Sequence, residues 1–302
     1  MTDVGGVQGQ AFADISGKTR ILGIFGDPVA HSLSPLMQNA ALRAAGIDAV
    51  YVPFHVRPEQ LPGAVAALRA LGIWGVNVTV PHKEAVMALL DEIDGPARLI
   101  GAVNTLVNRD GRLCGYNTDG EGLLESLRGD LGFTPAGRRI VLLGAGGACR
   151  AAVAALAARG AAWIGLANRS LPRAQALVNH FASHFPGTAF AILPLSPRGA
   201  GDELAQALAG ADLLVNTTSL GLRGEEIPLP WPALAPGAVV CDMVYRRGGT
   251  PLCRSARERG HLVTDGLGML AGQGERAFSL WTGQPPPFGV MKSRLLAELN
   301  DK

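Results

Sequence analysis

The sequence predicts an α/β protein with two domains, each built around a mostly parallel sheet. The 302 residues suffice for about two domains of ordinary size. Short apolar runs alternate with segments of helical spacing along most of the chain, and parallel strands need helical crossovers of this kind. A glycine-rich turn follows an apolar run near the middle of the chain, as it does in doubly wound sheets.

The first alternating series lies in the N-terminal third. Strand-like runs and helical segments follow one another in the order βαβαβ, with strands at 21–25, 50–56 and 74–80 and helices at 34–45 and 58–71. A helix at 84–90 comes next. The turn at 108–111 contains an Asp-Gly pair between strand-like runs at 102–107 and 113–116, which predicts a hairpin.

The second series begins after a helix at 122–131. Its strands are expected at 140–143, 162–167, 188–193, 212–216, 238–244 and 261–264, and its helices at 149–159, 172–185 and 202–208. Six strands with helices between them match a doubly wound, Rossmann-like dinucleotide-binding sheet. The final helical segments, 267–281 and 290–299, either cap that sheet or return to the first domain.

Composition excludes several classes of protein. Hydrophobic residues make up 48% and charged residues 17%, so the bulk of the chain is not disordered. The net charge of +2 gives no broad footprint for nucleic acid or an anionic membrane, and we expect neither as a partner. Residues 1–18 are expected to form a loose tail.

The four cysteines, at 114, 149, 241 and 253, lack metal-ligand spacing and do not indicate a disulfide scaffold. No signal peptide or membrane-spanning segment is recognisable in the sequence. Together these features predict a reduced, cytoplasmic protein without a bound metal.

The glycine-rich turn carries the strongest local signal. Its residues are Gly144, Ala145, Gly146, Gly147 and Ala148, directly after the apolar strand. Such a turn lets backbone amides approach a pyrophosphate at the start of the next helix. The third fingerprint position holds a cysteine, which is still small. A strand-to-helix turn that binds nothing is the alternative.

The end of the following strand indicates which dinucleotide is bound. An NAD site usually has an acid there, whereas this chain has Asn168, Arg169 and Ser170, with Arg173 three residues further on. Guanidinium groups and a hydroxyl suit a 2′-phosphate, which an acid would repel. We therefore expect NADP. The alternative is two solvated arginines at a helix start, which the helix dipole mildly disfavours.

Polar residues of the first half also lie at strand ends. Asn77 and Thr79 alternate with valines before Lys83, at the edge where α/β sheets bind ligands. Taken singly, they could equally be an exposed lysine and two ordinary strand-end residues. Ser34 fits a helix N-cap followed by proline, a role that leaves Ser32 unexplained.

Three further polar segments have an equally local explanation. They are Asn104-Thr105, Asn117-Thr118-Asp119-Gly120 and Asn216-Thr217-Thr218-Ser219. The first two are compatible with ordinary turns, since Asn, Asp and Gly favour turn conformations. The third follows an apolar strand and fits either a cofactor-side loop or a helix cap.

In combination, these segments resemble the shikimate dehydrogenase family, including its quinate/shikimate-using relatives, over residues 23–283. The matching segments are GDPVAHSLSP at 26–35, NVTVPHK at 77–83, GAVNT at 101–105, NTDG at 117–120, the glycine turn, NRS at 168–170, DMVY at 242–245 and GLGMLAGQ at 266–273. The resemblance implies NADP-linked, reversible reduction of 3-dehydroshikimate to shikimate in aromatic amino acid biosynthesis.

The resemblance also implies roles for individual residues. Lys83 and Asp119 correspond to the catalytic pair. The residues expected to hold the substrate are Ser32, Ser34, Asn77, Thr79, Asn104, Tyr245 and Gln273. Those expected to hold the cofactor are Gly144, Ala145, Gly146, Gly147, Ala148, Asn168, Arg169, Ser170, Arg173, Thr217, Ser219, Met243, Gly266 and Met269.

The family's organisation implies a substrate-binding catalytic domain at 19–118 and 271–302 and an NADP-binding domain at 119–270, with the last helix returning to the first domain. We expect a monomer or a homodimer. The chain departs from the family pattern at four positions. Gln38 stands where His is common, Arg247 where Pro is common, and Gly272 and Gly274 flank Gln273 where larger residues are usual.

The proposed chemistry also has a physical basis. Hydride delivery to a ketone builds negative charge on its oxygen, which an ammonium group can stabilise and protonate. Two alternatives remain. One is a quinate-preferring or amino-shikimate paralogue, and the other is a non-catalytic NADPH-binding regulatory protein on the same scaffold. The presence of both Lys83 and Asp119 disfavours the second.

Overall fold

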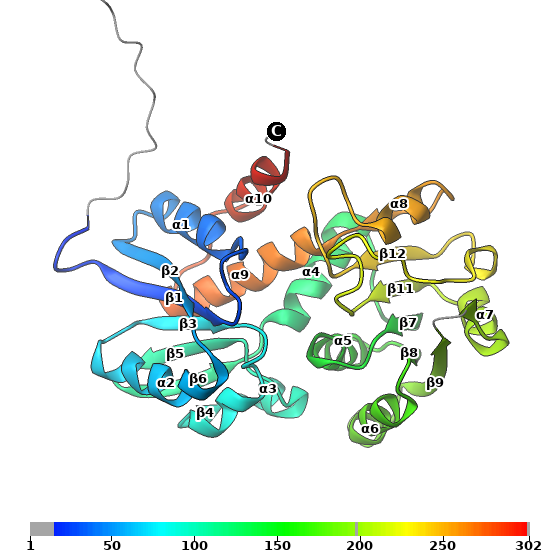
Figure 1. Ribbon diagram of the computed structural model, residues 1–302, viewed down its shortest axis with the longest axis horizontal. Coiled ribbons are helices and arrows are strands. Elements are labelled where there is room, and N and C mark those ends of the chain that lie inside the picture. Colours follow the sequence, from blue (N-terminus) through cyan, green and yellow to red (C-terminus); the bar gives the residue numbers. More distant parts are fainter. Residues whose placement is uncertain (1–14, 197–198, 301–302) are drawn as a thin grey trace, which may run out of the picture.

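The computed structural model describes residues 15–196 and 199–300, and these form two sheets joined by long helices (Figure 1). The first sheet has the strand order β2-β1-β3-β5-β6-β4, and the second has the order β10-β9-β8-β7-β11-β12-β13. The two-sheet α/β prediction is therefore confirmed. Most of the predicted N-terminal tail, residues 1–14, lies outside the described residues.

The predicted βαβαβ series forms one half of the first sheet. Strand β1 pairs in parallel with both β2 and β3. Helical crossovers connect the three strands. The elements are β1 (Arg20–Gly26), α1 (Ser34–Ala44), β2 (Ala49–His55), the 3₁₀ helix η1 (Pro58–Gln60), α2 (Leu61–Ala70) and β3 (Gly75–Val78).

The other half of the first sheet is antiparallel where the predicted hairpin lies. Strand β5 (Thr105–Arg109) pairs with β3 on one side and with β6 (Arg112–Tyr116) on the other. Asp110 and Gly111 have φ angles of 52° and 90°, as a two-residue hairpin turn requires. The hairpin is confirmed, but its first strand begins at 105, since 102–104 lie in the preceding loop. The short strand β4 (Glu92–Ile93) pairs with β6.

The helix predicted at 84–90 is shorter than expected and is a 3₁₀ helix rather than an α-helix. A 3₁₀ helix, η2 (Ala85–Leu89), occupies this segment, and Leu90 is already extended. Val86 is buried, and Met87, Leu89 and Leu90 are partly buried against the same apolar cluster, so the segment packs on the first sheet as a short 3₁₀ turn.

Helix α3 (Gly95–Ile100) was not predicted, although its start and end carry local signals. The Asp94 carboxylate caps it by accepting a hydrogen bond from the Ala97 nitrogen at 2.8 Å, and a proline lies in its first turn. Gly101 ends the helix in the left-handed conformation.

The second sheet has the strand order of a Rossmann fold. Six parallel strands, taken in chain order, lie in the order 3-2-1-4-5-6. The six strands are β7 (Arg139–Leu143), β8 (Trp163–Asn168), β9 (Ala189–Ser196), β11 (Leu213–Asn216), β12 (Val239–Asp242) and β13 (Val263–Thr264). The predicted crossover helices are α5 (Gly147–Ala158), α6 (Leu171–Ala182) and α7 (Asp202–Ala209).

Three short elements of this half were missed. They are β10 (Gly199–Ala200), the 3₁₀ helix η3 (Trp231–Ala233) and α8 (Pro251–Arg257). Helix α8 has a recognisable start, because the Thr250 hydroxyl accepts a hydrogen bond from the Cys253 nitrogen at 3.2 Å and a proline follows Thr250.

Helices α4 (Asp119–Leu131) and α9 (Gly266–Thr282) pack against each other between the two sheets (Figure 1). Their contact depends on glycine. A Cβ at Gly122 would lie 2.6 Å from the Gln273 nitrogen, and one at Gly272 would lie 3.1 Å from the Gly122 Cα. Because no side chain separates the helices there, the start of α4 lies close to Gln273.

The last helix, α10 (Val290–Asn300), packs against α1 (Figure 1). Its residues Met291 and Leu295 are fully buried in one apolar cluster with Leu22 and Met37 of the first sheet's layer. The predicted return of the C-terminal helix is thus confirmed. Within residues 15–196 and 199–300, none of the helices has the length and apolar character needed to cross a membrane.

Asp130, at the end of α4, joins α10 to the second sheet. Its carboxylate pairs with Lys292 and accepts hydrogen bonds from the Ser126 hydroxyl at 2.9 Å and the Thr264 hydroxyl at 2.8 Å. Burial disfavours the charged form, but the hydrogen bonds from Lys292, Thr264 and Ser126 hold the pKa of Asp130 below its usual 3.8.

Because the folded chain favours ionised Asp130, its contribution to stability is present above about pH 4 and is lost as the pH falls further. We expect Asp130→Asn to lower the free energy of unfolding at pH 7 by about 1–2 kcal/mol. The difference from wild type should shrink between about pH 4 and pH 2 in chemical denaturation. Lys292→Met should lose part of the same pH dependence. A difference that stays constant from pH 7 to pH 2 would contradict this role.

Candidate active site

A cavity of about 460 Å³ opens between the two sheets. Residues at the carboxyl edge of the first sheet line one side, and loops that follow strands of the second sheet line the other. Thirteen of the residues predicted to form the site line this cavity: Ser32, Ser34, Asn77, Thr79, Lys83, Asn104, Asp119, Ser219, Met243, Tyr245, Gly266, Met269 and Gln273.

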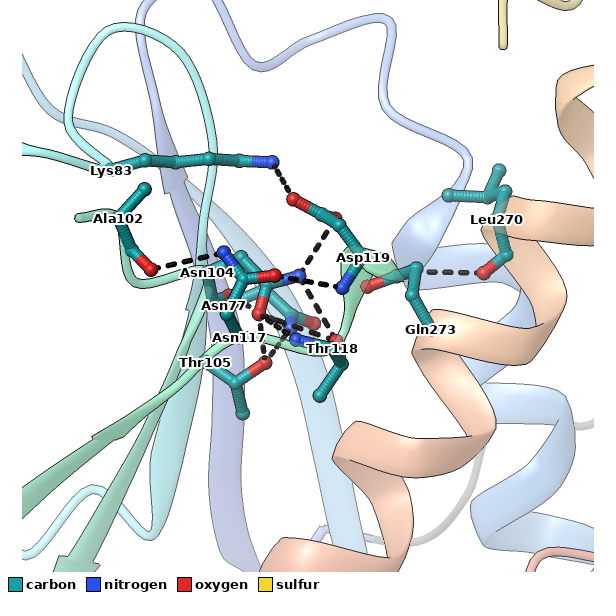
Figure 2. Close-up of polar contacts among 10 residues, drawn as sticks. All are labelled: Asn77, Lys83, Ala102, Asn104, Thr105, Asn117, Thr118, Asp119, Leu270 and Gln273. Atoms are coloured by element: carbon teal, nitrogen blue, oxygen red, sulfur yellow. Dashed lines mark hydrogen bonds and ion pairs between the residues drawn. The ribbon is translucent and has the colours of Figure 1, made fainter. Parts of the chain in front are cut away.

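Lys83 and Asp119 form an ion pair in the cavity wall, with the Lys83 Nζ 2.6 Å from the Asp119 Oδ2 (Figure 2). The Lys83 side chain is 23% exposed and that of Asp119 is 9% exposed. Lys83 lies in the turn after β3, and Asp119 is the first residue of α4, where the helix dipole favours a negative charge. An ammonium group and a carboxylate in contact beside a cavity can bind and protonate an oxygen of a ligand.

The Asp119 carboxylate is held from its other side by Asn104. The Asn104 Nδ2 donates to the Asp119 Oδ1 at 2.8 Å (Figure 2). In turn, the Asn104 Oδ1 accepts from the Thr118 nitrogen at 2.9 Å. The Asp119 nitrogen donates to the Asn117 Oδ1 at 3.1 Å. The two polar turns of the sequence thus meet around one carboxylate, leaving Asp119 little freedom to rotate.

Asn77 lines the cavity, but its amide is engaged within the protein. Its Nδ2 donates to the Asn104 carbonyl oxygen at 3.2 Å and to the Thr105 hydroxyl at 3.0 Å. Its Oδ1 accepts from the Tyr51 hydroxyl at 2.7 Å. Neither Tyr51 nor Thr105 was among the predicted site residues. Tyr51 occupies a strand position that resembles apolar core, and Thr105 was interpreted as part of a polar turn.

Ser32 and Ser34 lie at the start of α1, but Ser34 is not the N-cap that the sequence predicted. Leu33 is the N-cap of α1, and Ser34 is its first helical residue, so the predicted capping role of Ser34 is wrong. Proline at the second helical position fixes the start of the helix one residue earlier than expected. Ser34 is buried in the cavity wall, and Ser32 accepts a hydrogen bond from the Ser34 nitrogen at 3.3 Å.

Gln273 and Tyr245 face the cavity from the other side. The Gln273 Nε2 donates to the Leu270 carbonyl at 2.8 Å, which directs the side chain across the first turns of α9 (Figure 2). Burial raises the pKa of the Tyr245 hydroxyl, so it remains a neutral donor. Gln38, one of the departures from the family pattern, donates to the Gly274 carbonyl at 2.9 Å and so bonds to the backbone beside Gln273.

The glycine turn fits a pyrophosphate. Gly144 has a φ of 114°, and a Cβ there would lie 2.7 Å from the Thr217 hydroxyl, so this position requires glycine. Gly146 is the N-cap of α5, and a Cβ at either Gly146 or Gly147 would meet only open space. The first amides of α5 therefore have room for a negatively charged group.

Cys149, at the third position of the fingerprint, is fully buried against the sheet, and burial raises its pKa to about 12. Among the described residues all four cysteines are buried and free.

The loops after β11 and β12 line the cavity because a buried pair holds them together. The Asn216 Nδ2 donates to the Asp242 Oδ1 at 2.8 Å, and the same oxygen accepts from the Val244 nitrogen at 3.0 Å. Burial raises the pKa of Asp242. Neither Asn216 nor Asp242 was among the predicted site residues. Asn216 and Asp242 are the last residues of β11 and β12, and a polar residue at the end of an apolar strand was the feature that could have indicated them.

Some predicted cofactor residues lie at the same sheet edge but outside the cavity wall. They are Gly144, Ala145, Gly146, Gly147, Ala148, Asn168, Arg169, Ser170, Arg173 and Thr217. The Thr217 hydroxyl donates to the Leu143 carbonyl at 2.7 Å, so it supports the glycine turn.

Arg169 and Arg173 flank the start of α6, and both are exposed. Within the part of the chain that the structure describes, neither forms an ion pair with an acid. Two guanidinium groups at a helix N-terminus can hold a phosphate.

Three family models match the chain. The shikimate dehydrogenase substrate binding domain matches residues 24–106, shikimate / quinate 5-dehydrogenase matches residues 131–220, and the shikimate 5′-dehydrogenase C-terminal domain matches residues 266–296. Together they include Lys83, the glycine turn and Gln273.

Individual proteins are similar over nearly the whole chain. A shikimate dehydrogenase (NADP(+)) of Geobacter metallireducens is 56% identical over 95% of this chain and 99% of its own length. The structure of Thermus thermophilus shikimate 5-dehydrogenase in complex with NADP(H) and shikimate is 37% identical, covers 92% of this chain and 99% of its own, and has a TM-score of 0.82. A quinate dehydrogenase from Corynebacterium glutamicum in complex with NAD is 30% identical, covers 92% and 99%, and has a TM-score of 0.84.

Proposed function

The chain belongs to the shikimate dehydrogenase family, and on that premise we propose that it catalyses the reversible, NADP-dependent reduction of 3-dehydroshikimate to shikimate. It is an oxidoreductase of aromatic amino acid biosynthesis. The observation that carries the proposal is the ion pair of Lys83 and Asp119 at 2.6 Å, in a cavity also lined by loops of the Rossmann-type sheet.

The residues at the edge of the second sheet fit NADP. The open space at Gly146 and Gly147 accommodates the pyrophosphate at the start of α5. Arg169 and Arg173, with Asn168 and Ser170 between strand and helix, are assigned to the 2′-phosphate. The nicotinamide end is assigned to Ser219, Met243, Gly266 and Met269, which line the cavity, and to Thr217 beside the glycine turn.

When bound, the cofactor supplies the hydride to the substrate carbonyl carbon. Lys83 then stabilises the negative charge that develops on the carbonyl oxygen and donates a proton to it. Asp119 orients the ammonium group of Lys83 and accepts a hydrogen bond from a substrate hydroxyl. In the oxidation of shikimate, Lys83 accepts the proton.

The remaining polar groups of the cavity are assigned to the substrate. Ser32 and Ser34 are assigned to the carboxylate, because hydroxyl groups can donate to it. Thr79, Asn104 and Gln273 are assigned to the hydroxyl groups, and Tyr245 lies in the wall beside them. Asn77 is adjacent, with one acceptor position left on its Oδ1.

The two sheets correspond to two proposed domains. Residues 19–118 and 271–302 are assigned to substrate binding and catalysis, and residues 119–270 to NADP. The cytoplasm is the expected location, because the four free thiols suit a reducing compartment. A monomer or a homodimer remains the expected assembly.

Initial rates of the purified protein with shikimate and with quinate, each paired with NADP⁺ and NAD⁺, test the proposal. We expect kcat/KM to be highest with shikimate and NADP⁺. Replacing NADP⁺ with NAD⁺ should lower it by about tenfold or more, since two arginines are assigned to the 2′-phosphate. A preference for quinate would identify a quinate-using relative instead. The absence of turnover with all four pairs, together with tight NADPH binding, would favour a non-catalytic NADPH-binding protein.

A further inference from the structure

A continuous row of buried hydrogen bonds runs beneath the cavity from Tyr51 on β2 to Asp119 on α4. It passes through Asn77 on β3, Thr105 on β5 and the neighbouring Asn104 (Figure 2 shows all but Tyr51). Every member is at least nine-tenths buried. The row therefore connects three strands of the first sheet to the carboxylate that contacts Lys83.

The direction of the first bond is fixed by a backbone group. The Asn77 Nδ2 lies 3.2 Å from the Asn104 carbonyl oxygen, which can only accept, so the Asn77 Oδ1 must face Tyr51. The Tyr51 hydroxyl then donates to that Oδ1 at 2.7 Å. Burial raises the pKa of Tyr51 well above its usual 10.0, so the phenol keeps the proton that it donates.

The direction of the last bond is fixed independently. The Asn104 Oδ1 faces the Thr118 nitrogen at 2.9 Å, which can only donate, and its Nδ2 faces the Asp119 carboxylate at 2.8 Å, which accepts. The Thr105 hydroxyl lies between these two fixed amides. It must accept from the Asn77 Nδ2 at 3.0 Å and donate to the Asn104 Oδ1 at 2.9 Å.

We propose that Tyr51, Asn77 and Thr105 are positioning residues, which hold the Asn104 amide in place and through it the Asp119 carboxylate that orients Lys83. This inference rests on the proposed function of the Lys83–Asp119 pair. Tyr51 and Thr105 are not part of the cavity wall, whereas Asn77 also lines the cavity. The three strands are thereby linked to one catalytic carboxylate by bonds that each have a single allowed direction.

The physical consequence is a loss of alignment when the row is broken. Proton transfer depends on the position of the donor, and a misplacement of about 1 Å can cost up to about 10²-fold in rate. Asn104 is itself assigned to a substrate hydroxyl, but groups outside the row, such as Ser32 and Gln273, hold the substrate as well. Breaking the row should therefore lower kcat by a larger factor than it raises KM for shikimate.

Thr105→Val tests the proposal, because valine keeps the shape of threonine and removes its hydroxyl. We expect kcat for shikimate oxidation to fall about tenfold while KM changes less than about twofold. Thr105→Ser restores the hydroxyl and should recover kcat to within about threefold of wild type.

Thr188→Val is the matched control. The Thr188 hydroxyl is also buried and donates to the Ala161 carbonyl at 2.8 Å, away from the cavity. Both valine variants should show a similar fall in the midpoint of thermal unfolding, since each loses one buried hydrogen bond. Only Thr105→Val should lose kcat. A kcat of Thr105→Val within twofold of that of Thr188→Val, or a rise in KM with kcat unchanged, would overturn the proposal.

Tyr51→Phe gives a second test if Thr105→Val fails to fold. It removes the hydrogen-bond donor at the start of the row and should also lower kcat.

If the wild-type chain does not oxidise shikimate, the proposed function fails, and a crystal structure of the Thr105→Val variant then tests the inference. An Asn104 Nδ2 to Asp119 Oδ1 distance that stays at 2.8 Å would overturn it, and one beyond about 3.5 Å would support it.

Discussion

Replacing Lys83 with methionine is expected to lower kcat by a factor on the order of 10² to 10⁴, as the loss of a general acid does. Methionine has a similar length and no charge, so the variant removes the ammonium group that contacts Asp119 at 2.6 Å. The substitution does not alter the glycine turn or the two arginines at the start of α6, Arg169 and Arg173. NADPH affinity, measured by fluorescence titration, should therefore stay within about threefold of wild type.

Lys292→Met provides the control for the Lys83 prediction. Lys292 also forms an ion pair with an aspartate, Asp130, but lies outside the cavity wall. The control variant should lose stability and retain its kcat. A Lys83→Met enzyme with near-wild-type kcat would remove Lys83 from the proposed mechanism.

The second large effect is expected from Arg169→Ala combined with Arg173→Ala. Hydrogen bonds to charged groups contribute about 1.5–3 kcal/mol each, so losing two should raise KM for NADPH about 10²-fold. KM for NADH, which lacks the 2′-phosphate, should rise less than about threefold. Steady-state rates with both cofactors measure the ratio.

Arg43→Ala with Arg128→Ala is a matched control, since both of these arginines are also exposed and lie on other helices. The control pair should leave both KM values unchanged. If the Arg169 and Arg173 variant raised KM for NADPH and NADH equally, the two arginines would not recognise the 2′-phosphate.

Much of the fold follows from local periodicity. The alternation of apolar runs and helical segments predicted both sheets, because each parallel strand needs a crossover of recognisable length. The segments that failed were short. The 84–90 segment forms a 3₁₀ helix, which the spacing of a few apolar residues does not distinguish from a short α-helix. Helices α3 and α8 are marked only by Asp94 and Thr250 as N-caps with a following proline.

The site was less accessible to sequence reasoning than the fold. The family resemblance indicated Lys83 and Asp119, and the structure brings them together across 36 residues of sequence. Tyr51 was not singled out because a buried tyrosine on a strand is ordinary core, and Thr105 was interpreted only as part of a polar turn. Their contacts with Asn77 join three different strands, and no local spacing encodes such contacts.

The proposed mechanism requires Lys83 and Asp119 to face the reacting carbon of the substrate beside the nicotinamide end of the cofactor. A crystal structure of the complex with shikimate and NADP⁺ tests it most directly. We expect the Lys83 Nζ within about 2.6–3.2 Å of the substrate hydroxyl that is oxidised, with the nicotinamide against the loops of Ser219 and Met243. Shikimate bound elsewhere, or with that hydroxyl turned away from Lys83, would contradict the account.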